Sequence, residues 1–451
     1  MSEPPDFPDR NPDLREAERL SPMPPPVEAG SRSRLRGLAV DVSPLRRHRD
    51  FRLLWFGQGV SFLGGMVTYV AIPYQVYHLT GSSLAVGLLG LVELVPLLAA
   101  ALVGGALADA LDRRLMVRLT EAALAACSAC LLANSLLPHP AVWPLYLLSA
   151  ASAVMDGFQR PSLDALVPRL VERDEVPAAA ALQTVRFELA AIGGPALGGV
   201  LIATVGLPAT YGFDLITFAA SLGLLSMMRA VPPAPDAERP SLRRIREGWD
   251  YARSRPELIG TYVVDIVAMF FGMPMALFPA AATALGGPGV LGLLYAAPAV
   301  GSLITTATSG WSSRVHRHGA AVCVAAAVWG AGVVTFGLAS DLWLALAGLV
   351  IAGGGDMVSG LFRSTIWNQT IPDNLRGRLA GIEQVSYSTG PLLGNVESGA
   401  AASLVGVRGA IVSGGVLCVV GVGVAALMLP AFWRYDNRAP APGETAGRSV
   451  A

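Results

Sequence analysis

From Phe51 to about residue 430, long apolar stretches alternate with short polar breaks. A membrane-spanning helix needs about 20 mainly apolar residues, and twelve stretches meet this requirement. The predicted spans are 52–77, 83–107, 115–137, 141–165, 178–204, 209–229, 257–281, 288–311, 319–339, 342–366, 377–404 and 407–430. The pattern therefore predicts an all-α integral membrane protein with twelve transmembrane helices.

Composition supports lipid as the solvent of this chain. The 451 residues are 53% hydrophobic and only 15% charged, whereas soluble domains are about 25% charged. All 33 basic residues are Arg. The predicted loops on one side, near residues 78–82, 138–140, 205–208, 282–287, 340–341 and 405–406, contain no Arg.

The opposite loops and both tails hold the Arg residues. Those in the loops are Arg113, Arg114, Arg118, Arg169, Arg173, Arg239, Arg243, Arg244, Arg246, Arg253, Arg255, Arg314, Arg317, Arg376 and Arg378. Loops rich in Arg and Lys face the cytoplasm. We therefore expect a multi-pass protein of the bacterial inner (plasma) membrane with both termini cytoplasmic.

The polar breaks predict five parts. They are a disordered cytoplasmic tail (1–50), a six-helix bundle (51–229), a cytoplasmic linker (230–256), a second six-helix bundle (257–430) and a second tail (431–451). Leu242, Ile245, Trp249 and Ala252 of the linker fall at helical spacing, which favours an amphipathic helix on the inner leaflet. A solvated linker is the alternative.

The two bundles repeat each other. Residues 157–162 resemble residues 360–365, and residues 194–198 resemble residues 390–394, at the same six-helix offset. Parallel repeats of this kind place the substrate of a transporter between the halves. The glycines and prolines of the second pair favour two matched helix bends, with close packing alone as the alternative. These residues are Gly194, Pro195, Gly198, Gly199, Gly390, Pro391 and Gly394.

A short polar stretch, residues 104–114, separates the second and third spans. Its Gly105, Leu107, Ala108, Asp109, Arg113 and Arg114 resemble the signature loop of the major facilitator superfamily. Gly194, Pro195, Gly198 and Gly199 resemble that superfamily's exporter motif, with Ala190 in place of its first Gly. Residues 292–298 and 376–381 are similar to the superfamily's group of siderophore and drug exporters. The resemblance implies the major facilitator fold and export, and that the fifth and eleventh helices line the cavity.

The polar stretch also has a mechanical interpretation. The eleventh helix is expected to begin near residues 372–375, where its free N–H groups carry partial positive charge. When the halves close on the inner side, Asp109 could contact both that helix end and Arg113 and Arg114 of its own loop. Gly105 belongs to the same loop. We predict a conformational latch at these four residues. A topological anchor is the alternative.

Ionisable groups inside the spans are functional candidates, because they are costly in lipid. Those that we consider are Glu93, Asp156, Arg186, Glu188, Asp214, Asp265, Asp356, Glu383 and Glu397. We single out Glu188, Asp265 and Glu383 as carriers of a coupling proton, with Arg186 as a partner for one of them. Asp156 and Asp356 are expected to pair with Arg160 and Arg363. Asp214 is expected to be solvated near the outer surface.

Together these features favour a proton-coupled antiporter that exports small amphipathic molecules, siderophore-like or drug-like. Uptake of a small solute on the same fold and a non-transporting membrane sensor remain alternatives. We expect no enzyme, cofactor or metal site, because the five His do not cluster and Cys127 and Cys130 lie on an apolar helix. The expected partners are the cargo, protons and the lipid bilayer. We expect no nucleic acid partner and a monomer.

Overall fold

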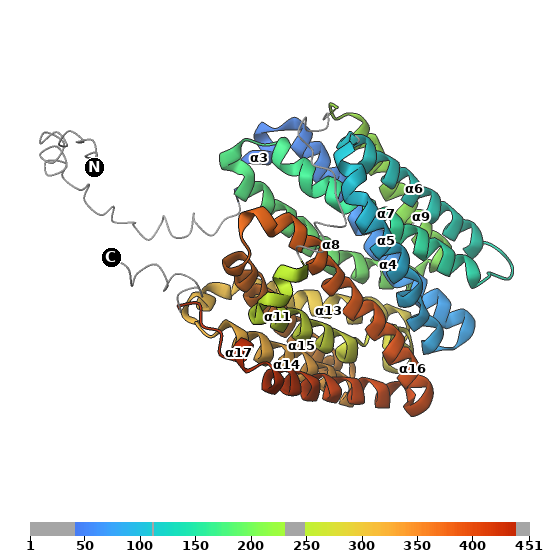
Figure 1. Cartoon of the computed structure of the whole chain (residues 1–451). Helices are drawn as coiled ribbons and strands as arrows, with labels where there is room; N and C mark the ends of the chain where they lie inside the picture. The colour runs from blue at the N-terminus through green and yellow to red at the C-terminus, as the bar shows by residue number, and fades with distance from the viewer. Residues whose placement is uncertain (1–40, 111, 231–248, 439–451) are drawn as a thin grey trace, which may run out of the picture. The chain divides into compact units, whose positions relative to one another are not determined.

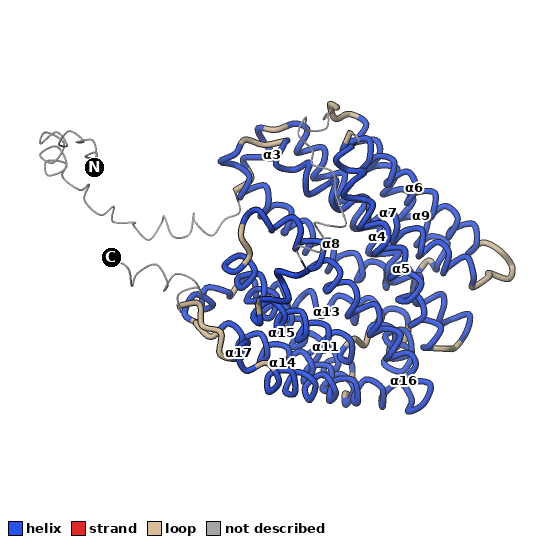
Figure 2. The backbone as a smooth tube through the Cα atoms, viewed as in Figure 1, coloured by secondary structure: helices blue, strands red, loops and turns tan. Residues whose placement is uncertain are grey.

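A computed structural model describes residues 41–110, 112–230 and 249–438. Helices joined by loops make up these three ranges, and no strand occurs in them (Figures 1 and 2). The predicted tail 1–40 and most of the linker, 231–248, lie outside them. Residues 249–254, which complete the predicted linker helix, are helical. The division into five parts stays a prediction.

Six long helices form the N-terminal group. They are α4 (Arg49–Thr80), α5 (Ser83–Ala110), α6 (Arg113–Ser135), α7 (Trp143–Leu166), α8 (Val176–Thr204) and α9 (Gly206–Ser226), with the short α3 (Ser43–Arg47), η1 (Val167–Arg169) and η2 (Arg173–Glu175) beside them. Within this group α4 packs on α8 and α9, α6 packs on α7 and α9, and α5 packs on α7. These contacts bury the apolar faces that the sequence pattern predicts.

The C-terminal group repeats this arrangement. It contains α11 (Pro256–Gly272), η3 (Met275–Leu277), α12 (Phe278–Leu285), α13 (Pro288–Ala307), η4 (Ser309–Arg314), α14 (His318–Leu338), α15 (Leu342–Thr370), α16 (Asp373–Met428) and α17 (Pro430–Trp433). Here α14 packs on α15 and α16, α13 packs on α15, and α11 packs on α16.

One predicted helix is broken where no break was expected, and one long helix contains a break at a predicted boundary. The expected helix 257–281 is broken after Gly272, because Met273 is extended (φ −94°, ψ 101°) and Pro274 has no N–H to donate. The 56 residues of α16 would span about 84 Å at 1.5 Å per residue, far beyond a hydrocarbon core of about 30 Å. Gly406, with φ 77°, divides α16 into two crossings. This break coincides with the predicted boundary at 405–406.

Ten helical stretches in the described ranges are long and apolar enough to cross a membrane. One of these stretches, Val385–Met428, includes both parts of α16. The helix α7 is not among the ten, and it carries Asp156, Gln159 and Arg160 within its length. The all-helical membrane fold is confirmed, and the count of twelve spans stays a prediction.

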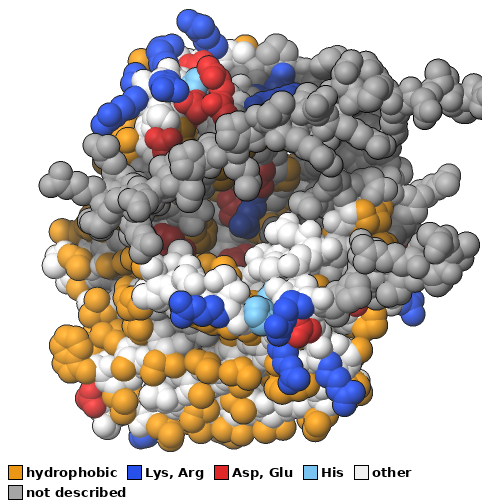
Figure 3. Space-filling model, turned by 90° about the vertical axis from the view of Figure 1, so that its left-hand side faces the viewer, with side chains coloured by type: hydrophobic (Ala, Val, Ile, Leu, Met, Phe, Trp, Pro, Cys, Tyr) orange, Lys and Arg blue, Asp and Glu red, His pale blue; other side chains and the backbone are white. Residues whose placement is uncertain are grey.

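Among the described residues, most Arg lie at one end of the helices, where α4, α6 and α14 begin; we call this the Arg-rich end. Figure 3 looks at the side of the molecule where α3 and α17 lie, and acidic and basic side chains are visible in a hollow there. Arg408 is an exception to the charge pattern. It donates to the carbonyls of Gly337 (3.1 Å) and Leu338 (2.8 Å), where α14 ends at the opposite end. A guanidinium there satisfies carbonyls that the helix leaves free.

The two groups of helices touch through glycines. A Cβ on Gly399 of α16 would lie 2.7 Å from the carbonyl oxygen of Ser83 in α5, and a Cβ on Gly199 of α8 would lie 2.6 Å from the nitrogen of Gly292 in α13. These contacts lie near the start of α5 and the end of α8, away from the Arg-rich end. Backbones this close leave no room for cargo at these two crossings, so the two groups are in direct contact at this end.

Candidate transport pathway

The C-terminal group contains a buried ion pair. Asp265 of α11 contacts the guanidinium of Arg363 of α15, and the two side chains are only 4% and 3% exposed. Asp356 lies 3.8 Å from the same guanidinium, which confirms the predicted pairing of Asp356 with Arg363. Ser386 donates to Asp265 (3.4 Å), and the Tyr387 ring faces Arg363 at 5.1 Å. The pair therefore joins α11 and α15 to α16.

The other predicted proton carriers are less enclosed. Glu188 of α8 and Glu383 of α16 are half-buried, and neither takes part in an ion pair between described residues. Arg186 of α8 packs against α4, where a Cβ on Gly59 would meet its Cγ at 3.4 Å. It forms no ion pair with Glu188, Asp265 or Glu383 in the described ranges. Arg363, not Arg186, is therefore the partner of Asp265.

The N-terminal group contains a polar pocket of about 320 Å³ between α4, α5, α6, α7 and α9. Glu121 of α6 lines it and is 1% exposed. One oxygen of its carboxylate accepts hydrogen bonds from Gln58 (2.7 Å), Ser61 (3.0 Å) and Gln159 (2.9 Å). Sequence reasoning missed Glu121. The available signal was an acid seven residues after Arg114, inside the apolar stretch of the third span.

Asp214 of α9 corrects an expectation. It is 1% exposed rather than solvated. One of its carboxylate oxygens accepts from Thr68 and Ser128, both at 2.6 Å, and Thr217 donates to its backbone oxygen at 2.7 Å. Hydroxyl groups on α4 and α6 thus compensate the buried carboxylate, which ties three helices together. The positions of these two hydroxyl groups could not be predicted from the sequence of α9, because they lie on other helices.

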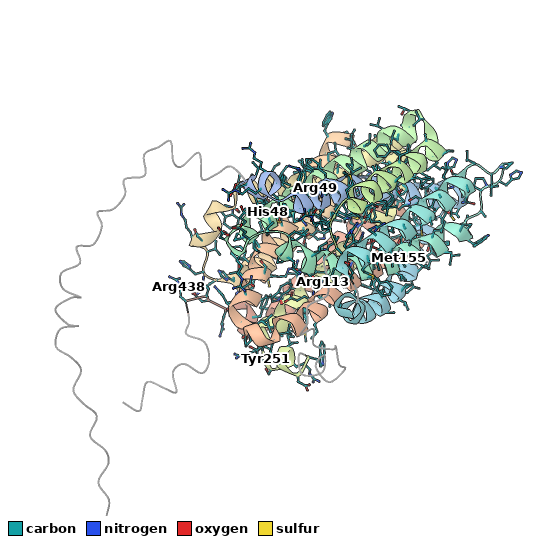
Figure 4. All side chains as sticks on the ribbon, turned by 90° about the horizontal axis from the view of Figure 1, so that it is seen from above. His48, Arg49, Arg113, Met155, Tyr251 and Arg438 are labelled. Carbon is teal, nitrogen blue, oxygen red and sulfur yellow. The ribbon has the colours of Figure 1, made fainter. Side chains whose placement is uncertain are left out.

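The structure describes the side chains of only part of the predicted latch, those from Asp112 onward. Asp112 caps α6 by accepting from the backbone N–H groups of Arg114 (2.9 Å) and Leu115 (3.3 Å). Arg113 donates to the carbonyl of Ala165 at 2.9 Å, and Arg114 donates to that of Ser226 at 2.7 Å. Arg113 is labelled in Figure 4. The Asp109 side chain lies outside the described part of the chain, so the latch stays a prediction.

The predicted bend residues pack closely. A Cβ on Gly194 would lie 2.9 Å from the carbonyl oxygen of Leu63, and one on Gly198 would lie 3.2 Å from that of Val67. On α16, a Cβ on Gly390 would meet Met269 and one on Gly394 would meet Met273, at 2.9 and 2.8 Å. These glycines, with Pro195 and Pro391 inside continuous helices, let α8 approach α4 and α16 approach α11. A bending role stays a prediction.

Aromatic side chains close the pathway away from the Arg-rich end. The Tyr69 hydroxyl of α4 donates to the sulfur of Met275 at 3.2 Å, and its ring lies edge-on to Tyr295 of α13, 5.6 Å between centroids. Asn395 of α16 accepts from the backbone N–H of Ala276 at 3.2 Å, which satisfies one donor in the broken part after α11. Residues from both groups therefore meet directly here.

This geometry, in which two helical groups enclose acid-lined space within a membrane-spanning fold, is typical of a solute transporter. The chain belongs to the family described as "Transmembrane secretion effector" (MFS_3), whose model matches residues 39–443. The protein is thus a multi-pass membrane transporter of the major facilitator type and not an enzyme, and transporters of this type act on small molecules.

Two relatives extend this family assignment. The chain is 28% identical over 406 residues to an enterobactin exporter of Citrobacter koseri, covering 89% of this chain and 97% of that one. It is 27% identical over 404 residues to the enterobactin exporter of Escherichia coli O1:K1, with the same two coverages.

Solved structures share the fold. A POT family transporter in complex with 5-aminolevulinic acid superposes with a TM-score of 0.67 at 11% identity, over 85% of this chain and 97% of that one. An inward-facing bacterial homologue of the iron transporter ferroportin superposes with a TM-score of 0.63 at 15% identity, over 85% and 98%. These likenesses confirm the major facilitator fold.

Proposed function

We propose that this protein exports small amphipathic molecules, siderophore-like or drug-like, in exchange for protons, by alternating access of its two helical groups. The observation that carries the proposal is the acid-lined space inside a membrane-spanning fold, closed by glycine and aromatic contacts at one end. The names of the relatives, both enterobactin exporters, support the outward direction.

In this proposal the Arg-rich end is cytoplasmic, as are both termini, in the inner membrane of a bacterium. Arg residues concentrate there, and Arg408 is the local exception at the outer end. The cargo then enters from the cytoplasm, and the contact of Tyr69 with Met275 and Tyr295 is the outer barrier. A single copy contains both halves, so the working unit is a monomer in the bilayer.

Asp265 is the best supported of the proton carriers. A buried carboxylate holds a buried guanidinium only while it is charged, and breaking such a pair costs about 3–5 kcal/mol. A proton arriving on Asp265 removes that attraction and leaves Arg363 with Asp356, 3.8 Å away. The linkage of α11 and α15 therefore depends on the proton. Glu188 and Glu383 are secondary carriers.

The inner closure is assigned to the latch of Gly105, Asp109, Arg113 and Arg114. Arg113 and Arg114 bind carbonyls near the ends of α7 and α9, which holds the start of α6 against the N-terminal group. Asp109 would meet the start of α16 when the halves close at the Arg-rich end, because a helix N-terminus attracts a carboxylate.

Inverted membrane vesicles test the proposal. Vesicles containing the protein are energised and given a panel of fluorescent dyes, antibiotics and siderophores, with vesicles lacking the protein as the control. We expect accumulation of at least one compound, lost when nigericin collapses the pH gradient. Accumulation that survives the collapse would overturn proton coupling. Movement only in the opposite direction would favour an uptake transporter.

A further inference from the structure

The ionisable side chains that line the pocket of the N-terminal group are all acidic. Four carboxylates from four helices line it, and no described lining residue is basic. They are Glu93 of α5, Glu121 of α6, Asp156 of α7 and Asp214 of α9. None of the four takes part in an ion pair between described residues. The ion pair of Asp265 with Arg363 in the C-terminal group shows the contrast, because there the buried acid has its own cation.

The four carboxylates differ in their surroundings. Asp214 and Glu121 accept two and three hydrogen bonds from neutral donors on one oxygen, so they are held in the pocket wall. Asp156 is exposed and Glu93 half-buried where they line the pocket. Asp156 also acts on Glu93 electrostatically. These two acids are therefore the ones that a molecule in the pocket can reach.

The guanidiniums that act on these acids lie outside the pocket. Arg160 acts on Asp156 from one turn further along α7, and Arg186 acts on Glu121 from α8. Neither lines the pocket, and neither is within ion-pair distance of these acids in the described ranges. Two neighbouring carboxylates repel each other when both are charged, and charges inside a membrane protein need partners. A positively charged guest supplies what the chain does not.

Two buried polar groups in the same pocket are incompletely satisfied. The Ser149 hydroxyl, on a residue that is 3% exposed, approaches the Glu93 carboxylate without forming a hydrogen bond of good geometry in the described ranges. The second carboxylate oxygen of Glu121 has no hydrogen-bond partner among the described residues, although the Ser221 hydroxyl approaches Glu121. A buried unsatisfied polar atom costs about 1–3 kcal/mol. Both atoms therefore favour a guest that carries polar hydrogens as well as charge.

The remaining walls are apolar and aromatic. Phe62 and Tyr69 of α4, Phe218 of α9 and Leu124 of α6 line the pocket. Tyr69 is 42% exposed, and Glu93 acts on it electrostatically, so an aromatic face and a carboxylate lie near each other. Aromatic faces attract cations within about 6 Å of the ring centroid. A volume of about 320 Å³ is that of a site for a small organic molecule.

From these observations we infer that the N-terminal pocket is a binding site for an amphipathic organic cation, held by Glu93 and Asp156 with the ring of Tyr69. The inference rests on the proposed function, since it names the cargo class. It also excludes anions as the guest of this pocket, because an anion would meet four carboxylates. Polar hydrogens on the cation would bind Ser149 and Glu121.

A matched pair of ions tests the inference. Tetraphenylphosphonium and tetraphenylborate have nearly the same size and shape and opposite charge. Binding of each to the full-length protein, purified in neutral detergent at pH 8, is measured by equilibrium dialysis. We expect the cation to bind and the anion to bind at least about tenfold more weakly. Equal binding of the two ions would overturn the inference, because it would show an apolar site without charge selection.

Variants locate the site. Glu93→Gln and Asp156→Asn are each expected to weaken cation binding about tenfold, and Glu397→Gln on α16, outside this pocket, serves as the matched control. Tyr69→Phe keeps the ring and should bind nearly as the parent does, whereas Tyr69→Leu should bind more weakly. Thermal unfolding shows that each variant is folded. Unchanged binding in both acid variants would place the cation elsewhere and refute the assignment.

The inference and the proposed function can fail separately. Proton-driven transport of neutral or anionic compounds without cation binding would leave the proposed function standing and remove the cation site. Selective cation binding that depends on Glu93 and Asp156, without any transport by the same preparation in vesicles, would support the site and count against the function.

Discussion

The contact between α8 and α13 offers a direct way to shift the protein between states. In Gly199→Ala the new Cβ would lie 2.6 Å from the nitrogen and 2.7 Å from the Cα of Gly292. Ordinary contact needs about 3.4 Å, so the helices must separate by about 0.8 Å. Both facing atoms are backbone, which cannot turn away as a side chain does. Overpacking of this kind costs about 1–3 kcal/mol.

That cost falls only on the state in which the two helices touch. If alternating access separates them, the open state keeps its energy and the closed-to-open ratio falls about 5- to 150-fold. Gly193→Ala is the matched control, because on the same helix its Cβ meets only a side-chain atom of Leu63 at 3.5 Å. It adds the same methyl group without the backbone clash.

Double electron–electron resonance between two spin labels measures this shift in the closed-to-open ratio. Labels at Val205 and Ala284, exposed residues near the ends of α8 and α12, report the separation of the halves in a background without the four native cysteines. Gly199→Ala should move population to longer distances, and Gly193→Ala should leave the distribution as in the parent. If both variants gave the parent distribution, the tight crossing would be wrong, and so would the argument that the two groups are closed away from the Arg-rich end.

Other predictions test single contacts. Asp265→Asn should abolish export driven by a pH gradient while cargo exchange at equal pH persists, and gradient-driven export at the parent rate would count against Asp265 as the carrier. Asp109→Asn should slow turnover with little change in cargo binding, whereas unchanged turnover would reduce the latch to an anchor. Asp214→Ala leaves the hydroxyls of Thr68 and Ser128 without their acceptor, and the buried loss should lower thermal stability by about 1–3 kcal/mol; an unchanged melting temperature would contradict this.

The helical membrane fold could be predicted from the sequence because apolar length is a local property. The pattern located even the break at Gly406, where two apolar stretches meet. The break after Gly272 was missed, although Pro274 marked it, because the apolar stretch continues through it. Charge counting missed Arg408, since a guanidinium away from the Arg-rich end can bind free helix carbonyls.

The candidate site was harder to predict than the fold, because the site depends on which helices pack together. Asp265 stood out as a buried acid, but its partner Arg363 lies on a helix far along the chain. The sequence predicts a solvated Asp214, because its hydrogen-bond donors Thr68 and Ser128 lie on other helices. Glu121 lies inside the apolar stretch of the third span, and its role becomes visible only from its hydrogen bonds with Gln58 and Gln159 of other helices.

Reconstitution of the purified protein tests the central claim, exchange of an amphipathic cargo for protons, most directly. Liposomes with an acidic lumen are loaded with a pH dye, and cargo entry and luminal pH are followed together. We predict that cargo accumulates while the lumen becomes more alkaline faster than in protein-free liposomes, and that Asp265→Asn loses both signals. Cargo accumulation with no change in proton flux would contradict the account.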